Sequence, residues 1–118
     1  MALHSELPIY KVAYDLSDLA IDLVRNMPRD VKGVIGSELR DQCLELVVLI
    51  YRANVARDKV QFLTDLIERL QVAELLLRLS RDKHFISTKQ YAAAITLTGS
   101  IGRQATAWRK SSASSPAT

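Results

Sequence analysis

Apolar residues recur at helical spacing through most of the chain. From residue 8 to residue 27 they follow one another at alternating steps of four and three: Ile9, Ala13, Leu16, Ala20, Leu23 and Met27. This spacing places a single apolar stripe along an α-helix. Pro8 suits a first helical turn, because its missing N–H would have no intrahelical partner there, and Pro28 drives the residue before it out of the α region. We therefore predict a first helix over residues 8–26.

The second predicted helix begins between residues 31 and 37 and ends near residue 54, with Gly33 and Gly36 leaving its start open. Its apolar positions are Leu39, Cys43, Leu46, Val47, Ile50 and Tyr51. The run LVVLIY over residues 46–51 would suit a strand if taken alone, but the helical pattern on both sides favours a helix. Because this segment is apolar nearly all round, we expect it to contact other chains as well as its own core.

Two further helices carry local start signals. Asp58 and Gln61 have the spacing of a capping box, and so do Ser87 and Gln90. The third helix, ending near residue 79 or 80, has the stripe Leu63, Leu66, Ile67, Leu70, Ala73 and Leu77. The fourth helix has the stripe Tyr91, Ala94, Ile95, Thr98, Ile101, Ala105 and Trp108.

Four helices of similar length joined by short connections predict an all-α fold, an antiparallel up-down-up-down four-helix bundle. A chain of 118 residues has room for one hydrophobic core. We assign residues 1–110 to the bundle. Residues 111–118 (SSASSPAT) have no apolar anchor, and we expect them to form a disordered tail.

The sequence offers little chemistry for catalysis or for a cofactor. His4 and His84 have no cysteine or carboxylate at ligand spacing on a shared helix face, so we expect no metal site. Ser37 and Cys43 have no histidine nearby in the sequence to activate them, so we expect no enzyme either. The segment GVIG over residues 33–36 lacks the lysine and the preceding strand of a phosphate-binding loop. The single cysteine, Cys43, excludes an internal disulfide and is expected to be a buried thiol. With no candidate membrane span and no signal peptide, we expect a cytoplasmic protein.

The distribution of charge is more informative than the net charge of +3. Residues 1–82 contain all thirteen acidic residues and eleven basic residues. Residues 83–118 contain five basic residues and no acidic one. An antiparallel bundle gathers basic residues at both of its ends. We predict that one end binds nucleic acid through Arg52, Arg57, Lys59, Arg103, Arg109 and Lys110, and the other through Arg78, Arg81, Lys83 and Lys89.

Two considerations bear on that prediction. Cations near helix C-termini also interact favourably with the helix dipole, so a merely solvated basic surface stays open as an alternative. The sequence has neither a groove-reading motif nor a cluster of aromatic residues expected to be exposed. We therefore expect contacts to phosphates rather than to bases.

Three segments resemble a known family. Residues 52–59 (RANVARDK), 86–91 (ISTKQY) and 101–110 (IGRQATAWRK) are similar to the accessory variability determinant (Avd) proteins of diversity-generating retroelements. These share a four-helix-bundle superfamily with proteins encoded by intervening sequences in bacterial 23S ribosomal RNA genes. The intervening-sequence branch usually carries Asn-Ile-Ala-Glu-Gly at the end of its second helix. Residues 53–57 read ANVAR at that place, which favours the Avd branch.

The resemblance implies partners that the residues alone do not. It implies a barrel-shaped homopentamer that associates with a reverse transcriptase and with template RNA or an RNA–DNA hybrid, and that supports mutagenic retrohoming without an active site of its own. A second apolar face of the first helix is then a candidate subunit contact, or alternatively part of a wider protomer core: Tyr10, Tyr14, Ile21 and Val24.

Two other functions stay open at this point. One is a bundle associated with ribosomal RNA or the ribosome, like the intervening-sequence proteins, and the neighbourhood of the gene would separate it from the retroelement function. The other is a protein–protein adaptor, which salt-dependent RNA binding would exclude.

Overall fold

The structure is a computed structural model that describes residues 3–114, and within that range it contains helices and no strand. The four long helices are α1 (Pro8–Arg25), α3 (Ser37–Val55), α4 (Val60–Asp82) and α5 (Thr88–Ser114). Three short elements complete the described part of the chain: the 3-10 turn η1 (His4–Glu6), the short helix α2 (Arg29–Val31) and the π-helical turn η2 (Lys32–Gly36). The all-α class predicted from the sequence is confirmed.

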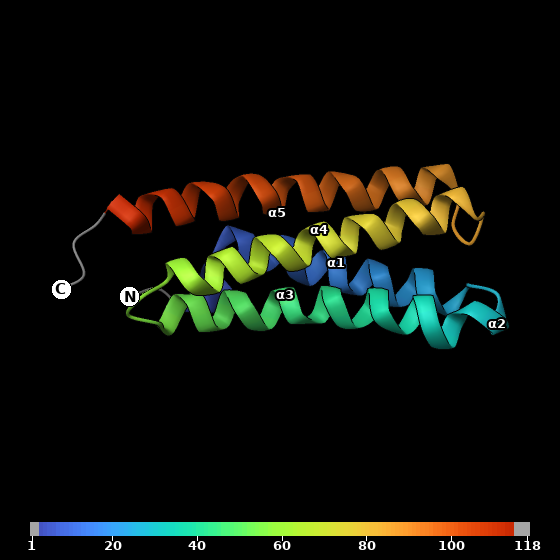
Figure 1. The fold of residues 1–118 in the computed structure, drawn as a ribbon, viewed down its shortest axis with the longest axis horizontal. Coiled ribbons are helices and arrows are strands. Elements are labelled where there is room, and N and C mark those ends of the chain that lie inside the picture. Colours follow the sequence, from blue (N-terminus) through green and yellow to red (C-terminus); the bar gives the residue numbers. More distant parts are fainter. Residues whose placement is uncertain (1–2, 115–118) are drawn as a thin grey trace.

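Each long helix packs against two others. α1 and α4 each contact both α3 and α5. In Figure 1, α1 and α4 run from left to right, and α3 and α5 run from right to left. The first described residues, the α3–α4 connection (56–59) and the last turn of α5 lie together on the left, which we call the termini end. The α1–α3 connection (26–36) and the α4–α5 connection (83–87) lie on the right, which we call the hairpin end.

The core follows the predicted stripes closely. All six residues of the first predicted stripe are buried, five of them in α1 and Met27 just after its end. In α4 every stripe residue is buried except Ile67, which is partly buried and packs on the core. In α3 the stripe residue Tyr51 is 47% exposed. Leu49 and Ala53 are buried in the core, although they were not part of the predicted stripe. In α5, Trp108 is partly buried and packs against the core at the termini end.

One predicted capping box is confirmed and the other is wrong. The Ser87 N–H donates to Gln90 Oε1 (2.8 Å), and the Gln90 N–H donates to Ser87 Oγ (3.0 Å). Asp58 lies outside α4, because that helix begins only at Val60. Asp58 Oδ1 accepts a hydrogen bond from the Val60 N–H (3.2 Å), which leaves Gln61 one position into the helix instead of at its third. Gln61 bonds forward along the helix to the carboxylate one turn later.

α4 ends at Asp82, two residues beyond the predicted end, in a Schellman arrangement. The Phe85 N–H donates to the Ser80 carbonyl (2.8 Å) and the His84 N–H donates to the Arg81 carbonyl (3.0 Å). The φ angle of His84 is 62°, in the left-handed region that this motif requires and that glycine usually adopts. The tight reversal directs the chain straight into α5.

Gly36 permits the close approach of α3 to α1. A Cβ added at Gly36 would lie 2.8 Å from Val24 Cγ1 and 3.4 Å from the sulfur of Met27. Val24 is 5% exposed and belongs to the protomer core. Its prediction as a subunit contact is therefore wrong, because the glycine lets α3 cover it.

α5 is longer than expected. We assigned residues 111–118 to a tail, but the helix continues through Ser114, whose hydroxyl donates to the carbonyls of Lys110 (3.2 Å) and Ser111 (3.1 Å). The helix therefore extends one turn beyond the predicted end. The rest of the predicted tail, residues 115–118, lies outside the described residues.

Candidate nucleic-acid interface

The termini end brings together basic residues from α3, the α3–α4 connection and α5. Arg52 lies in the last turn of α3, Arg57 lies in the connection, and Lys110 lies near the end of α5. Arg103 lies farther from this end, next to Gly102, which faces Leu70 in the middle of α4. All four side chains are exposed, whereas Arg109 is partly buried. Within residues 3–114 none of the five forms an ion pair with a carboxylate. Their charges are therefore available to an external anion.

Lys59 has a different role from the one predicted. Its ammonium group lies 2.9 Å from the Ala53 carbonyl oxygen, 2.9 Å from that of Asn54 and 3.0 Å from that of Ala56. The last carbonyls of α3 have no intrahelical donor, and the three N–H groups of Lys59 match these three acceptors. Lys59 thus caps the end of α3 and has no N–H group left to donate to a phosphate. It is therefore not a candidate for contacts to nucleic acid.

The hairpin end carries Arg78, Arg81, Lys83 and Lys89, and three of these side chains are exposed. Arg81 is the exception. Its Nε and Nη2 both donate to Asp82 Oδ1 (3.1 and 2.9 Å), and its guanidinium lies over the Tyr91 ring. Of these four residues, Arg78, Lys83 and Lys89 therefore remain available to an external anion.

Helix α5 carries basic residues and no acidic residue along its length. Its only charged residues are Lys89, Arg103, Arg109 and Lys110. Most of the acidic residues lie on the other three long helices, including Asp15, Asp18 and Asp22 on α1. A phosphate chain lying along α5 would consequently meet cations at both ends of the helix and no carboxylate of the same helix.

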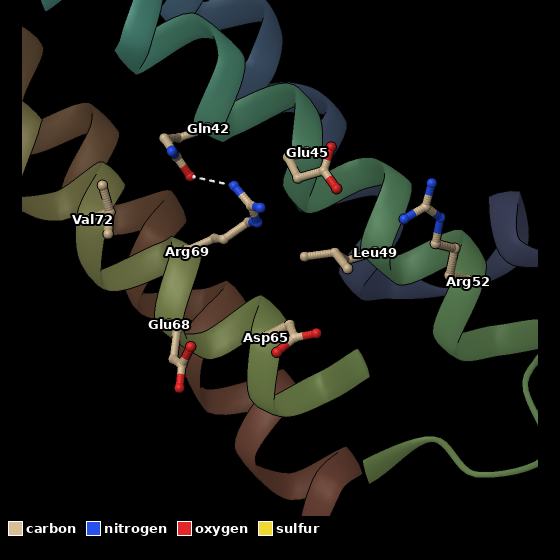
Figure 2. A pocket seen from close by; sticks show the side chains of 8 residues that line it. All are labelled: Gln42, Glu45, Leu49, Arg52, Asp65, Glu68, Arg69 and Val72. Carbon is tan, nitrogen blue, oxygen red and sulfur yellow. Dashed lines mark hydrogen bonds between the residues drawn. The ribbon is translucent and has the colours of Figure 1, made fainter. Parts of the chain in front are cut away.

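A polar groove of about 390 Å³ runs between α3 and α4. Figure 2 shows Arg69 reaching across it to Gln42, with Arg69 Nη1 3.2 Å from Gln42 Oε1. Two arginines and three carboxylates line it: Arg52, Arg69, Glu45, Asp65 and Glu68. This groove was not predicted from the sequence, because its residues come from two separate helices. Its mixed charge makes it a poor site for a polyanion.

The outer face of α1 and α3 is apolar. Tyr14 is 58% exposed and Ile21 40% exposed, while Tyr10 is partly buried and packs against the core. A shallow groove of about 320 Å³ separates them from α3, whose exposed apolar residues extend the face: Leu44, Val48, Tyr51 and Val55. We call this surface the α1/α3 face. It includes three of the four residues predicted as a subunit contact.

Aromatic rings gather at the termini end of that face. The His4 ring lies edge-on to Tyr10 (centroids 5.1 Å apart) and to Tyr51 (4.9 Å), and Tyr14 lies 6.4 Å from Tyr10. The sequence did not indicate that these rings gather, and two of them, His4 and Tyr10, are partly buried. His4 and Tyr51 are far apart in the sequence, and only the packing of the first residues onto α3 brings them together.

The described residues offer little else for chemistry. In residues 3–114 no group of three or more His, Cys, Asp or Glu side chains is placed to hold a metal ion. The Cys43 thiol is fully buried, and burial raises its pKa from 9.0 to about 12, so it stays protonated near neutral pH. None of the described helices is long and apolar enough to cross a membrane.

These features define a small helical bundle with basic ends and one large apolar outer face. A protein-family model described as bAvd-like matches residues 8–112, and the chain belongs to that family. No curated protein matches the chain. The resemblance to Avd proteins inferred from residues 52–59, 86–91 and 101–110 is thereby confirmed.

Proposed function

We propose that this chain is a cytoplasmic, non-catalytic accessory protein of a diversity-generating retroelement. In this proposal it binds the reverse transcriptase and holds template RNA or an RNA–DNA hybrid during mutagenic retrohoming. The observation that carries the proposal is membership of the bAvd-like family over almost the whole bundle. The exposed cations without carboxylate partners and the acid-free helix α5 support the nucleic-acid part of it.

The contacts to nucleic acid are proposed to be phosphate contacts. At the termini end they are made by Arg52, Arg57, Arg103, Arg109 and Lys110, and at the hairpin end by Arg78, Lys83 and Lys89, with a smaller part for Arg81. Side chains of this kind position a strand without reading its sequence. The binding is therefore expected to depend strongly on salt and weakly on base sequence.

We further propose that the up-down-up-down bundle assembles into a homopentamer through the α1/α3 face. An exposed apolar face that combines several tyrosine, leucine, isoleucine and valine side chains is typical of a surface covered by a partner. Five copies would place five sets of basic ends around one axis, which multiplies a weak patch into a strong field.

The assembly can be tested by light scattering on the purified full chain. The proposal predicts a mass about five times that of the 13.2 kDa protomer. Tyr14→Glu with Val48→Glu should lower that mass while the helix content is kept, because both side chains are exposed in the protomer. Val34→Glu, at a 70% exposed site outside the face, is the matched control and should leave the mass unchanged.

The function can be tested by reconstitution with the reverse transcriptase of the same retroelement and its template RNA. The proposal predicts that the chain copurifies with the enzyme and increases template-dependent cDNA synthesis. Arg103→Glu with Lys110→Glu should reduce that increase, whereas Lys11→Glu with Arg69→Glu, an equal change of charge outside the proposed contacts, should not. Copurification with no effect of either variant on cDNA synthesis would favour a protein–protein adaptor.

A further inference from the structure

A second basic site lies at the hairpin end, at the junction of α1, η2 and α3. A pocket of about 520 Å³ opens there. Four cations line it: Arg25 from α1, Arg29 from α2, Lys32 from η2 and Arg40 from α3. None of the residues that line the pocket is acidic. These cations lie outside the two basic sets proposed above, and only the packing of four elements brings them to one cavity.

The cations of the pocket are available to a ligand. Arg29 and Lys32 are exposed, and within residues 3–114 neither side chain forms an ion pair or a hydrogen bond. Arg25 pairs with Asp22 at 3.8 Å and Arg40 pairs with Asp41 at 3.5 Å, but all four of these side chains are well exposed. Surface pairs of this kind contribute little free energy. A phosphate group, which carries more charge and more acceptor oxygens, would compete effectively for both arginines.

The backbone at the pocket is also open. Gly33 lines the cavity within the π-helical turn, and a Cβ added at Gly33 would meet no atom within 4 Å. Glycine lets a ligand approach the main chain, and π-helical turns recur at functional sites. Ser37 also lines the pocket, but its hydroxyl donates to the Lys32 carbonyl (3.4 Å) and is not counted as a phosphate contact.

We propose that this pocket binds a phosphate group through Arg29 and Lys32, with Arg25 and Arg40 closing around it. The group would belong either to the backbone of an RNA strand or to a small free polyphosphate. Planar guanidinium groups bond two phosphate oxygens at once, and three of the four cations are arginines. The proposal does not depend on the retroelement function, since a free phosphate compound is sufficient to test it.

The first test is calorimetric titration of the full chain with inorganic tripolyphosphate. Arg29→Gln with Lys32→Gln removes two charge-assisted contacts, and the dissociation constant should rise at least about tenfold. Lys11→Gln with Arg69→Gln removes the same charge at two exposed sites outside the pocket and should change it by less than about twofold. Circular dichroism should show unchanged helix content in both variants.

The second test separates a pocket from a diffuse field. Gly33→Leu places a side chain into the open space without changing any charge, and it should weaken tripolyphosphate binding at least about fivefold. If Gly33→Leu binds like the wild type, or if the Lys11/Arg69 control loses as much affinity as the pocket variant, the proposal is overturned.

The source of the phosphate follows from a parallel titration with a short fluorescent oligouridylate. If the pocket variants weaken both probes, the ligand is the backbone of an RNA strand. If they weaken tripolyphosphate and leave oligouridylate binding unchanged, the ligand is a small free polyphosphate. Both results support the pocket, and loss of oligouridylate binding alone would contradict it.

Discussion

The guanidinium carbon of Arg81 lies 4.3 Å from the centre of the Tyr91 ring and thereby joins the last turn of α4 to the first turn of α5. The same side chain donates to Asp82 Oδ1 through two nitrogens. Arg81 therefore serves the α4–α5 reversal more than it serves an external anion. The sequence analysis predicted Arg81 as a phosphate contact, but most of the interactions of its guanidinium group are with Asp82 and Tyr91.

The first prediction concerns the intramolecular contacts of Arg81. Arg81→Gln removes the cation from the Tyr91 ring and should lower the free energy of unfolding by about 0.5–1 kcal/mol. It should weaken RNA binding less than Lys83→Gln, because Lys83 is exposed and makes no such contact. Thermal unfolding and fluorescence anisotropy with labelled RNA measure the two effects. The reverse ranking, with Arg81→Gln neutral for stability and worse for RNA, would refute the assignment.

The second prediction concerns His84, whose φ of 62° is unfavourable for a residue with a Cβ. His84→Gly should raise the free energy of unfolding by up to about 1 kcal/mol, because the Schellman motif is kept and the strain is removed. His84→Ala keeps the Cβ and should give no gain. Denaturant unfolding of the three proteins provides the comparison. A loss of stability in His84→Gly would mean that the imidazole makes a stabilising contribution greater than the strain.

The third prediction contrasts two glycines. Gly36→Ala forces a Cβ to within 2.8 Å of Val24 Cγ1, so it should destabilise the fold by about 1–3 kcal/mol. Val24→Ala in the same chain should recover part of that loss. Gly33→Ala meets open space and should be neutral or stabilise by up to about 1 kcal/mol. Equal effects at the two positions would be inconsistent with the packing of α3 on α1.

The fourth prediction concerns pH. Burial raises the pKa of the Cys43 thiol from 9.0 to about 12, so the folded state holds its proton more tightly than the unfolded state does. The stabilisation from the neutral thiol is complete below pH 9 and is lost as the pH rises from 9 towards 12. Compared with Cys43→Ala, the wild type should lose unfolding free energy between pH 9 and 11. A constant difference over that range would show that the thiol is accessible to water.

The features of the fold that depend on residues close together in the sequence were predicted correctly in most cases. The stripe of α1 needs only its period, and the Ser87–Gln90 box needs only two residues three apart. The Asp58–Gln61 box failed because α4 begins at Val60, and nothing local marks that start. Val24 was misplaced because its burial depends on Gly36, which belongs to another segment.

The candidate sites were less accessible, because their members are distant in the sequence. Lys59 was counted as a phosphate contact, but its position relative to two α3 carbonyls and that of Ala56 depends on the geometry of the connection. The pocket with Arg29 and Arg40 likewise depends on how η2 turns between α1 and α3. Composition locates positive charge along a chain, and packing decides which charges remain free.

The most direct test of the account is the salt dependence of RNA binding by the full chain, measured as the affinity for single-stranded RNA between about 50 and 200 mM salt. Binding through phosphates predicts a linear fall of log affinity with log salt, with a slope of about −0.7 for each phosphate contacted. Arg103→Glu with Lys110→Glu should flatten that slope and weaken all RNA sequences about equally, and Lys11→Glu with Arg69→Glu should leave it nearly unchanged. An affinity that does not depend on salt, or a slope that neither variant changes, would contradict binding through phosphates at the basic ends of the bundle.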